Sequence, residues 1–166
     1  DLNIIKKFSG KIEIKEGNTY VIISENENNN INLNLDYNNI KKFSESFPRI
    51  VIIGTYNNIS IKTTNAHVEN NKDENLDTRY NDRQLTGCIN LIDAKFNNFF
   101  AEITNMPCED ALNMIRSVGN INLLQILNSQ SDALDLDFSK IYIKNIEINQ
   151  AVNDCLDFSF GKYEIL

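Results

Sequence analysis

One short stretch of this chain returns at a fixed interval. Its three copies begin at residues 109, 131 and 153, so each copy starts 22 residues after the one before it. A weaker copy begins at residue 86, 23 residues before the first of the three. A period of this length is typical of solenoids, in which each unit packs only on its neighbours.

Each copy has the pattern of a strand with one apolar face. Leu112 and Met114 alternate with Ala111 and Asn113, and a period of two is typical of a half-buried strand. A second strand is expected in each copy after a polar turn, over residues 99–103, 121–126 and 141–148. Two strands and two turns within 22 residues predict one coil of a parallel β-helix. The outward positions of successive coils then form one column, Asn90, Asn113, Asp135 and Asp157.

Other repeat architectures fit less well. A leucine-rich repeat needs more leucines and a fixed Asn, and the alternation with its β-branched residues excludes a helical repeat.

The first half of the chain is less regular but fits the same architecture. Strands are expected over residues 10–22 (two strands around a Gly turn), 31–35, 49–53 and 59–62. Residues 38–47 are expected to form a short helix or a loop, and the polar stretch 65–84 a loop. We therefore expect one domain over residues 1–166 with about six coils and a loop projecting near residues 65–85.

The chain is acidic, with a formal net charge of −7 and a pI near 4.7. Because Lys and Arg form no stripe, nucleic acid is not an expected partner. No apolar run approaches the length needed to cross a bilayer, and anionic lipid headgroups repel an acidic surface. Membrane insertion is therefore not expected either.

Cysteine and asparagine both have structural interpretations. The three cysteines, Cys88, Cys108 and Cys155, do not indicate a disulfide framework. Cys88 and Cys155 share a repeat position three coils apart, roughly 14 Å at the spacing of β-strands, which is too far for a disulfide. We expect these small residues to fill a tight column. The abundant Asn suits turns and hydrogen-bonded ladders between coils.

Four segments follow a pattern known from other proteins. Residues 12–21 form a strand pair around Glu16-Gly17-Asn18, residues 49–61 run strand, Gly turn, strand, and residues 132–139 and 153–159 carry the repeat. In these segments the chain resembles right-handed parallel β-helix proteins of the pectate-lyase-like superfamily. The resemblance implies an all-β, single-stranded right-handed parallel β-helix (a solenoid) with coils of about 22 residues. Because this superfamily includes lyases, hydrolases, epimerases, esterases, tailspikes and adhesins, it implies no single activity.

Acidic residues recur at two positions of the repeat. One group precedes the strand in each copy: Asp110, Asp132 and Asp154. Asp at this position accepts hydrogen bonds from turn amides, so we expect a structural ladder. A second group points outward: Asp135, Asp137 and Asp157. Carboxylates ~4.8 Å apart in neighbouring coils raise each other's pKa or share a cation. The second group is therefore a candidate for Ca²⁺ ligands, or for the acid and base of glycoside hydrolysis.

The resemblance also implies a base, because lyases of this superfamily pair Ca²⁺-holding acids with an Arg or Lys that abstracts a proton. Arg116 and Lys140 lie just beyond the acidic strands and are the candidates. The Arg-Pro signature of the lyases and the Gly-His-Gly of the polygalacturonases are both missing. The single histidine, His67, lies in the 65–84 loop and is expected to be solvated. Tyr142 is expected to point outward and to offer a sugar a stacking surface.

Three functions remain open. The first is a surface or secreted module that binds polysaccharide, with or without Ca²⁺, through Asn113, Asp135, Asp157 and Tyr142. The second is a carbohydrate-active enzyme, a polysaccharide lyase or glycoside hydrolase, which uses Asp135, Asp137 and Asp157 with Lys140 or Arg116. The third is an acidic protein-binding module such as an immunity protein or inhibitor. The first two predict an extracellular or cell-surface location. Since another coil has begun before Leu166, we expect further domains or an oligomer partner to cover that end.

Overall fold

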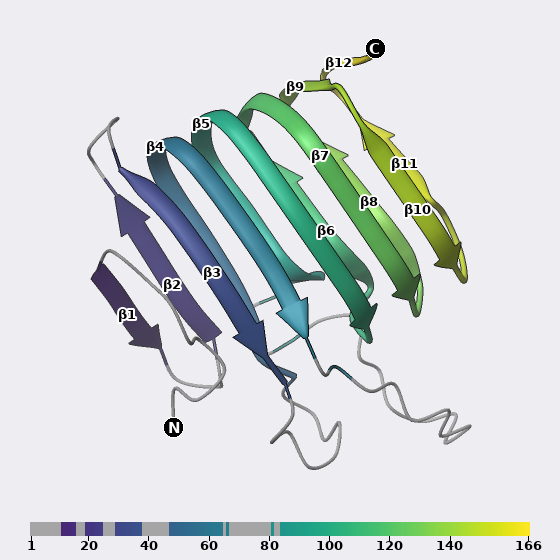
Figure 1. Ribbon diagram of the computed structural model, residues 1–166, viewed down its shortest axis with the longest axis horizontal. Helices are drawn as coiled ribbons and strands as arrows, with labels where there is room; N and C mark the ends of the chain where they lie inside the picture. The colour runs from purple at the N-terminus through teal and green to yellow at the C-terminus, as the bar shows by residue number, and fades with distance from the viewer. Residues whose placement is uncertain are drawn as a thin grey trace.

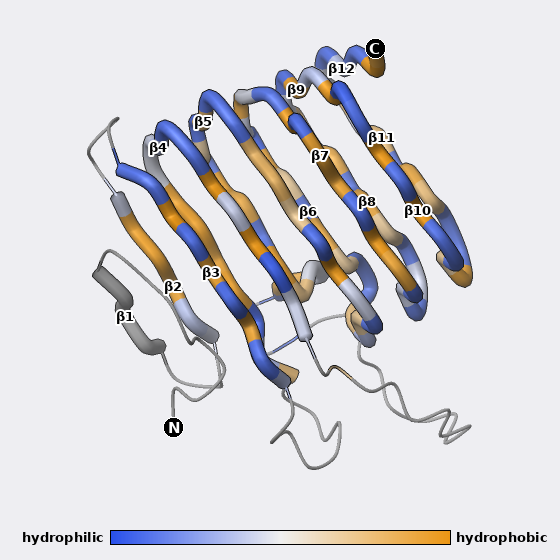
Figure 2. Tube along the Cα trace, in the orientation of Figure 1, coloured by the Kyte–Doolittle hydropathy of each residue, from blue (hydrophilic) through white to orange (hydrophobic). Residues whose placement is uncertain are grey.

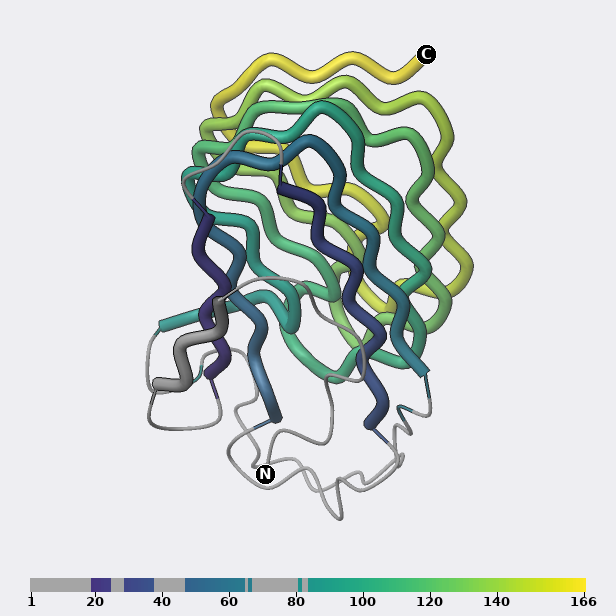
Figure 3. The backbone as a smooth tube through the Cα atoms, turned by 60° about the vertical axis from the view of Figure 1, so that its left-hand side comes forward, coloured from purple at the N-terminus to yellow at the C-terminus, as the bar shows by residue number. Residues whose placement is uncertain are grey.

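The computed structural model describes residues 11–15, 19–24, 29–37, 47–64, 66, 81 and 84–166. In this part of the chain every regular element is a strand, and the strands form one curled sheet (Figure 1). β1 (Lys11–Lys15) pairs antiparallel with β2 (Thr19–Ser24), and the other described pairings are parallel. The protein is therefore all-β, with a largely parallel sheet that curls like half a barrel (Figure 3).

The remaining strands are β3 (Asn30–Asp36), β4 (Arg49–Thr64), β5 (Gly87–Met106), β6 (Asp110–Ile115), β7 (Val118–Ser129), β8 (Asp132–Asp137), β9 (Lys140–Ile143), β10 (Ile146–Ala151), β11 (Leu156–Ser159) and β12 (Lys162–Ile165). Two strands are expected over residues 49–53 and 59–62, but the structure has one continuous strand there, β4. This strand bends at Gly54, where φ is 109°. A side chain at Gly54 would strike the Ser24 carbonyl, so glycine is required at this bend. The expected segment 38–46, His67 and nearly all of the 65–84 loop lie outside the described residues.

The strands pair in the register that the repeat predicts. Leu112 on β6 pairs with Leu134 on β8, which pairs with Leu156 on β11, a step of 22 residues each time. Ile89 on β5 pairs with Leu112, 23 residues on, as the weaker copy predicts. The repeat in the sequence is therefore the distance along the chain between paired strands.

Apolar side chains of one parity stack inside the curl, and Figure 2 shows the alternation along strands such as β3 and β8. One column consists of Tyr20, Ile50, Ile89, Leu112 and Leu134, all buried. Burying one aliphatic side chain of this size contributes roughly 1.5–3 kcal/mol. These stacked columns are therefore the main source of stability in the sheet.

The chain turns a corner at a residue in the left-handed region, although none of these residues is glycine. The residues are Asp93 (φ 52°), Arg116 (φ 49°), Phe138 (φ 51°) and Phe160 (φ 37°). Their side chains pair along the stack: Arg116 donates two hydrogen bonds of 2.8 Å to Asp93, and the rings of Phe138 and Phe160 stack 5.6 Å apart. These side-chain contacts offset part of the conformational free energy that a non-glycine residue loses in the left-handed region.

A buried serine hydroxyl closes the corner in two successive coils. Ser139 Oγ lies 2.8 Å from the Asp137 carbonyl and 3.1 Å from the Met114 carbonyl of the preceding coil, and it donates to these oxygens. The same Oγ accepts a hydrogen bond of 2.9 Å from the Ser117 amide. The hydroxyl therefore ties one corner to the next.

In the following coil a tyrosine takes the place of this serine. The equivalent residue is Gly161, and the Tyr163 hydroxyl occupies the space that a side chain at Gly161 would need. Tyr163 Oη donates to the Leu136 carbonyl at 2.8 Å and the Ser159 carbonyl at 2.9 Å, and accepts from the Ser139 amide at 3.3 Å. The phenol therefore makes the set of contacts that serine makes one coil earlier.

Asparagine ladders cross the strands, as the sequence predicts. Asn58 Nδ2 donates to Asn30 Oδ1 at 2.6 Å, and Asn98 Nδ2 donates to Asn58 Oδ1 at 2.9 Å. A second ladder joins Asn128 to Asn105 at 2.8 Å. The prediction of stacked Asn is therefore confirmed.

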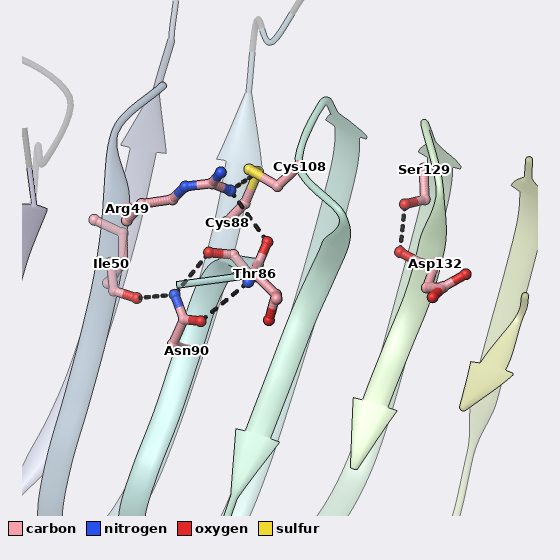
Figure 4. The surroundings of a disulfide bond; sticks show 9 residues. Arg49, Ile50, Thr86, Cys88, Asn90, Cys108, Ser129 and Asp132 are labelled. Atoms are coloured by element: carbon pink, nitrogen blue, oxygen red, sulfur yellow. Dashed lines mark hydrogen bonds between the residues drawn. A yellow bond between two sulfur atoms is a disulfide. The ribbon is translucent and has the colours of Figure 1, made fainter. Parts of the chain in front are cut away.

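Cys88 and Cys108 form a disulfide, with their Cα atoms 5.4 Å apart (Figure 4). The expectation that Cys88 and Cys155 only fill a tight column is therefore wrong, because Cys88 is cross-linked and Cys155 is exposed. Cys108 precedes β6, and the pairing of β6 with β5 brings it to Cys88, whereas Cys155 is free and exposed. Arg49 donates to the Thr86 carbonyl at 3.3 Å, and its guanidinium lies 3.9 Å from the Cys88 sulfur.

Candidate functional site

The column expected to face outward passes from buried to exposed along the sheet. Asn113 pairs with Asp135, and Asp135 pairs with Asp157. Asp135 is half-buried and Asp157 is exposed, but Asn90 and Asn113 are buried. The expectation of an outward position is therefore wrong for Asn90 and Asn113, because the second face of β5 and β6 is covered as well. Thr86 contributes to this cover, since Asn113 Nδ2 donates to Thr86 Oγ1 at 2.7 Å.

Asp135 is the acid whose environment is most perturbed. Burial is the main cause that raises the pKa of Asp135 to about 7, and the charges of Asp110, Asp137 and Asp157 contribute to this rise in that order. Asn113 Nδ2 donates to Asp135 Oδ2 at 3.2 Å and to Asp110 Oδ2 at 3.1 Å. Burial also raises the pKa of Asp110, to about 6, against the opposing hydrogen bonds from Thr86 and Asn113. The amide of Asn113 thus joins two carboxyl groups that protonate near neutral pH.

Asp137 completes this group of acids. Burial raises the pKa of Asp137, and the charge of Asp157 adds to the effect. Asp135 and Asp137 lie on the same side of β8, with Asp157 on the neighbouring strand. Acids whose environments move their pKa apart can divide into a proton donor and a proton acceptor.

Of the three acids that precede the strands, Asp132 has the contact with a backbone amide that the sequence predicts. Asp132 Oδ1 accepts hydrogen bonds of 2.8 Å from the Asp154 amide and from Asn153 Nδ2. Asp110 is buried and accepts from Asn113. Asp154, in the last copy, is exposed.

The residues do not fit the calcium site that the sequence predicts. Within the described ranges, no three His, Cys, Asp or Glu side chains gather so that they could hold a metal ion together.

The two candidate bases lie in different environments. Arg116 is bound by Asp93, and this hydrogen-bonded pair raises the pKa of Arg116, which opposes a role in proton abstraction. Lys140 is exposed, and its Nζ lies 5.9 Å from the centre of the Tyr142 ring. Tyr142 alternates with buried Ile141 and Ile143, so the prediction that it points outward is confirmed.

A groove of about 300 Å³ lies elsewhere, on the outer face of β5, β7 and β10. Its side chains come from two columns in register. One column is Glu102, Gln125 and Glu147, and the other is Thr104, Leu127 and Asn149. Gln125 Nε2 donates to Glu147 Oε2 at 2.9 Å, and Glu102 pairs with Lys62. Ile103 and Ile126 lie between the columns and are buried.

The groove combines apolar and polar surface. Leu127 is 42 % exposed in its centre, between Thr104 and Asn149. Phe100, two residues before Glu102, is also exposed and pairs with Leu123. Sequence reasoning missed this groove because the candidate acids lie at the first strand of each copy, whereas the groove lies on the second strand. The signal was present in the 22- and 23-residue steps that place Glu102, Gln125 and Glu147 in one column.

Comparison with known proteins adds no relative. No known protein family, no curated protein and no solved structure matches the chain. Among the described residues, none belongs to a helix long and apolar enough to cross a membrane.

Proposed function

We propose that the protein is a module that binds polysaccharide, and that the groove on β5, β7 and β10 is the binding surface. The observation that carries the proposal is the groove itself, in which exposed Leu127 lies among hydrogen-bonding side chains on three parallel strands. Its volume of about 300 Å³ is at the lower end of the range for ligand sites, which suits a short stretch of a sugar chain.

The chemistry of this face suits a sugar. A pyranose ring has an apolar C–H face and a rim of hydroxyl groups. Leu127 and Phe100 provide exposed apolar surface for the ring face. Glu147, Gln125 and Asn149 provide carboxylate and amide groups for the hydroxyls.

The proposed fold is a right-handed parallel β-helix with coils of 22 residues, similar to the pectate-lyase-like superfamily. The pairing of β6, β8 and β11 at 22-residue steps supports it. We also propose an extracellular or cell-surface location, supported by the Cys88–Cys108 disulfide, since disulfides persist mainly in oxidising compartments. Leu156 and Ile165 are exposed on the edge strands, which supports a further coil or an oligomer partner at that edge.

The test is binding to a panel of immobilised polysaccharides, measured as retardation, with a matched pair of variants. Leu127→Ala should weaken retention several-fold, because it removes apolar contact area in the groove. Val118→Ala is the control, since Val118 lies on the same strand with 43 % exposure but outside the groove. Equal retention of both variants, or no retention of the wild type on any polysaccharide, would contradict the proposal.

A second candidate function is glycoside hydrolysis by the acids on β8 and β11. The observation that favours it is the half-buried Asp135, whose pKa of about 7 suits a proton donor, beside Asp137 and Asp157. The assay is the release of new reducing ends from the polysaccharide that the protein retains. Asp135→Asn should abolish release and leave retention intact. Release that persists in Asp135→Asn would exclude this role.

A further inference from the structure

The charged groups of the groove select the kind of sugar that it can hold. Among the described residues that line it, none is Lys, Arg or His, and the charged side chains are Glu102 and Glu147. Lys62 pairs with Glu102, whereas Glu147 accepts only from the neutral amide of Gln125 among the contacts in the groove. Glu147 therefore places a carboxylate on the outer face of an acidic protein, with no cationic side chain among the described residues that line the groove.

A ligand must complement this charge. The net charge of −7 repels polyanions at long range, and an anionic group beside Glu147 is repelled at short range. A protonated amine gains a charge-assisted hydrogen bond to the same carboxylate. A neutral sugar hydroxyl gains only an ordinary one.

We propose that the groove binds a glycan that bears free amino groups, with the ammonium on Glu147 and the ring face on Leu127. This inference rests on the proposed polysaccharide-binding function and names its ligand class. Leu127 belongs to the column next to Glu147, and its strand pairs directly with β10. Leu127 and Glu147 are diagonal neighbours, one strand apart and two residues along, which separates them by ~8 Å. An amine and the face of the same sugar ring can therefore contact both residues. An acidic polysaccharide, which the resemblance to lyases suggests, is disfavoured at this face.

The experiment compares two ligands that differ only at the nitrogen substituent, an ammonium group in one and a neutral acetamide in the other. Binding of an oligomer of β-linked glucosamine and of the same oligomer after N-acetylation is measured by titration calorimetry at mildly acidic pH. The wild type should bind the amine form about tenfold more tightly, the effect of one charge-assisted hydrogen bond. Added salt should weaken binding of the amine form and leave the acetylated form unchanged.

Two variants test whether the carboxylate of Glu147 is the group that recognises the amine. Glu147→Gln should remove most of the tenfold preference, since it keeps the shape of the side chain and the acceptor for Gln125. Glu164→Gln, an exposed acid on β12 outside the groove, makes the same charge change and should keep the preference.

The outcomes separate this inference from the function on which it rests. Equal affinity for the two oligomers, or equal loss in both variants, overturns the inference and leaves polysaccharide binding standing. No binding of either oligomer, together with no retention on any polysaccharide, overturns both. Equally tight binding of an oligolysine peptide with the same dependence on Glu147 shows recognition of charge without the sugar, and overturns the inference.

Discussion

The Tyr163 hydroxyl offers a sharp test of how the coils are joined, because it replaces a serine that a neighbouring coil uses. Tyr163→Phe removes one oxygen and keeps the ring, which packs on Phe158 with centroids 4.8 Å apart. The change leaves the Leu136 carbonyl without its 2.8 Å donor and the Ser139 amide without its 3.3 Å acceptor. Leu136 and Ser139 are buried, so water does not readily replace the lost partner.

The expected cost follows from these contacts. A buried polar group left without a partner costs about 1–3 kcal/mol. Because the Tyr163 side chain is itself half-buried, partial hydration lowers the expected total to about 1–2 kcal/mol. For a domain of this size that change lowers Tm by about 2–8 °C.

The assay is urea unfolding of the oxidised protein, followed by far-UV circular dichroism. Tyr163→Phe should lower the midpoint with no change in the m-value. Tyr142→Phe is the matched control, because Tyr142 points outward on β9, and it should stay within about 0.5 kcal/mol of wild type. A loss below about 0.5 kcal/mol in Tyr163→Phe, or an equal loss in both variants, would refute the argument that the phenol closes the corner.

Two further predictions concern covalent and proton-linked stability. Reduction of the Cys88–Cys108 disulfide, which spans 20 residues, should lower the free energy of unfolding by about 3 kcal/mol. The substitution Cys155→Ser should leave the free energy of unfolding unchanged. Unfolding in urea with and without reductant tests the first expectation, and equal midpoints would contradict it. Burial is the main cause that raises the pKa of Asp110 to about 6 and the pKa of Asp135 to about 7, whereas both groups titrate near pH 4 in the unfolded chain. The folded state therefore holds protons that the unfolded chain has already released. These groups stabilise the fold at low pH and lose that contribution as the pH rises through 6 and 7. Asp135→Asn should therefore be more stable than wild type at pH 8 and equal to it near pH 4, and an unchanged difference across this range would show that Asp135 does not titrate as described.

The repeat by itself determined the pairing of the strands. Parallel strands in neighbouring coils pair at equivalent positions, so the step from Leu112 to Leu134 and Leu156 predicted the register. Period-two alternation likewise predicted that Tyr142 points outward and that Leu134 lies in the core. These properties depend on local chemistry repeated at a fixed interval, which a single sequence displays.

Only the tertiary structure decided which outward positions reach solvent. Asn113 and Asp135 share a repeat position, yet Asn113 is 2 % exposed and Asp135 is half-buried. Asn113 is covered by Thr86, the first residue of the weaker copy, which accepts a hydrogen bond from its amide. Alternation describes the two faces of a strand and carries no information about a segment that later covers one of them.

The disulfide was decided in the same way, whereas the repeat already placed the groove residues in columns. Cys108 lies outside the repeat positions, so the spacing that excluded a bond between Cys88 and Cys155 was silent on the bond between Cys88 and Cys108. The groove needs Glu102, Leu127 and Glu147 to lie on one face of three strands, which the sheet brings together. The periodic pattern therefore determined which residues stack. Contacts between residues at non-equivalent positions determined what is buried and what is cross-linked, because these depend on the path of the chain in three dimensions.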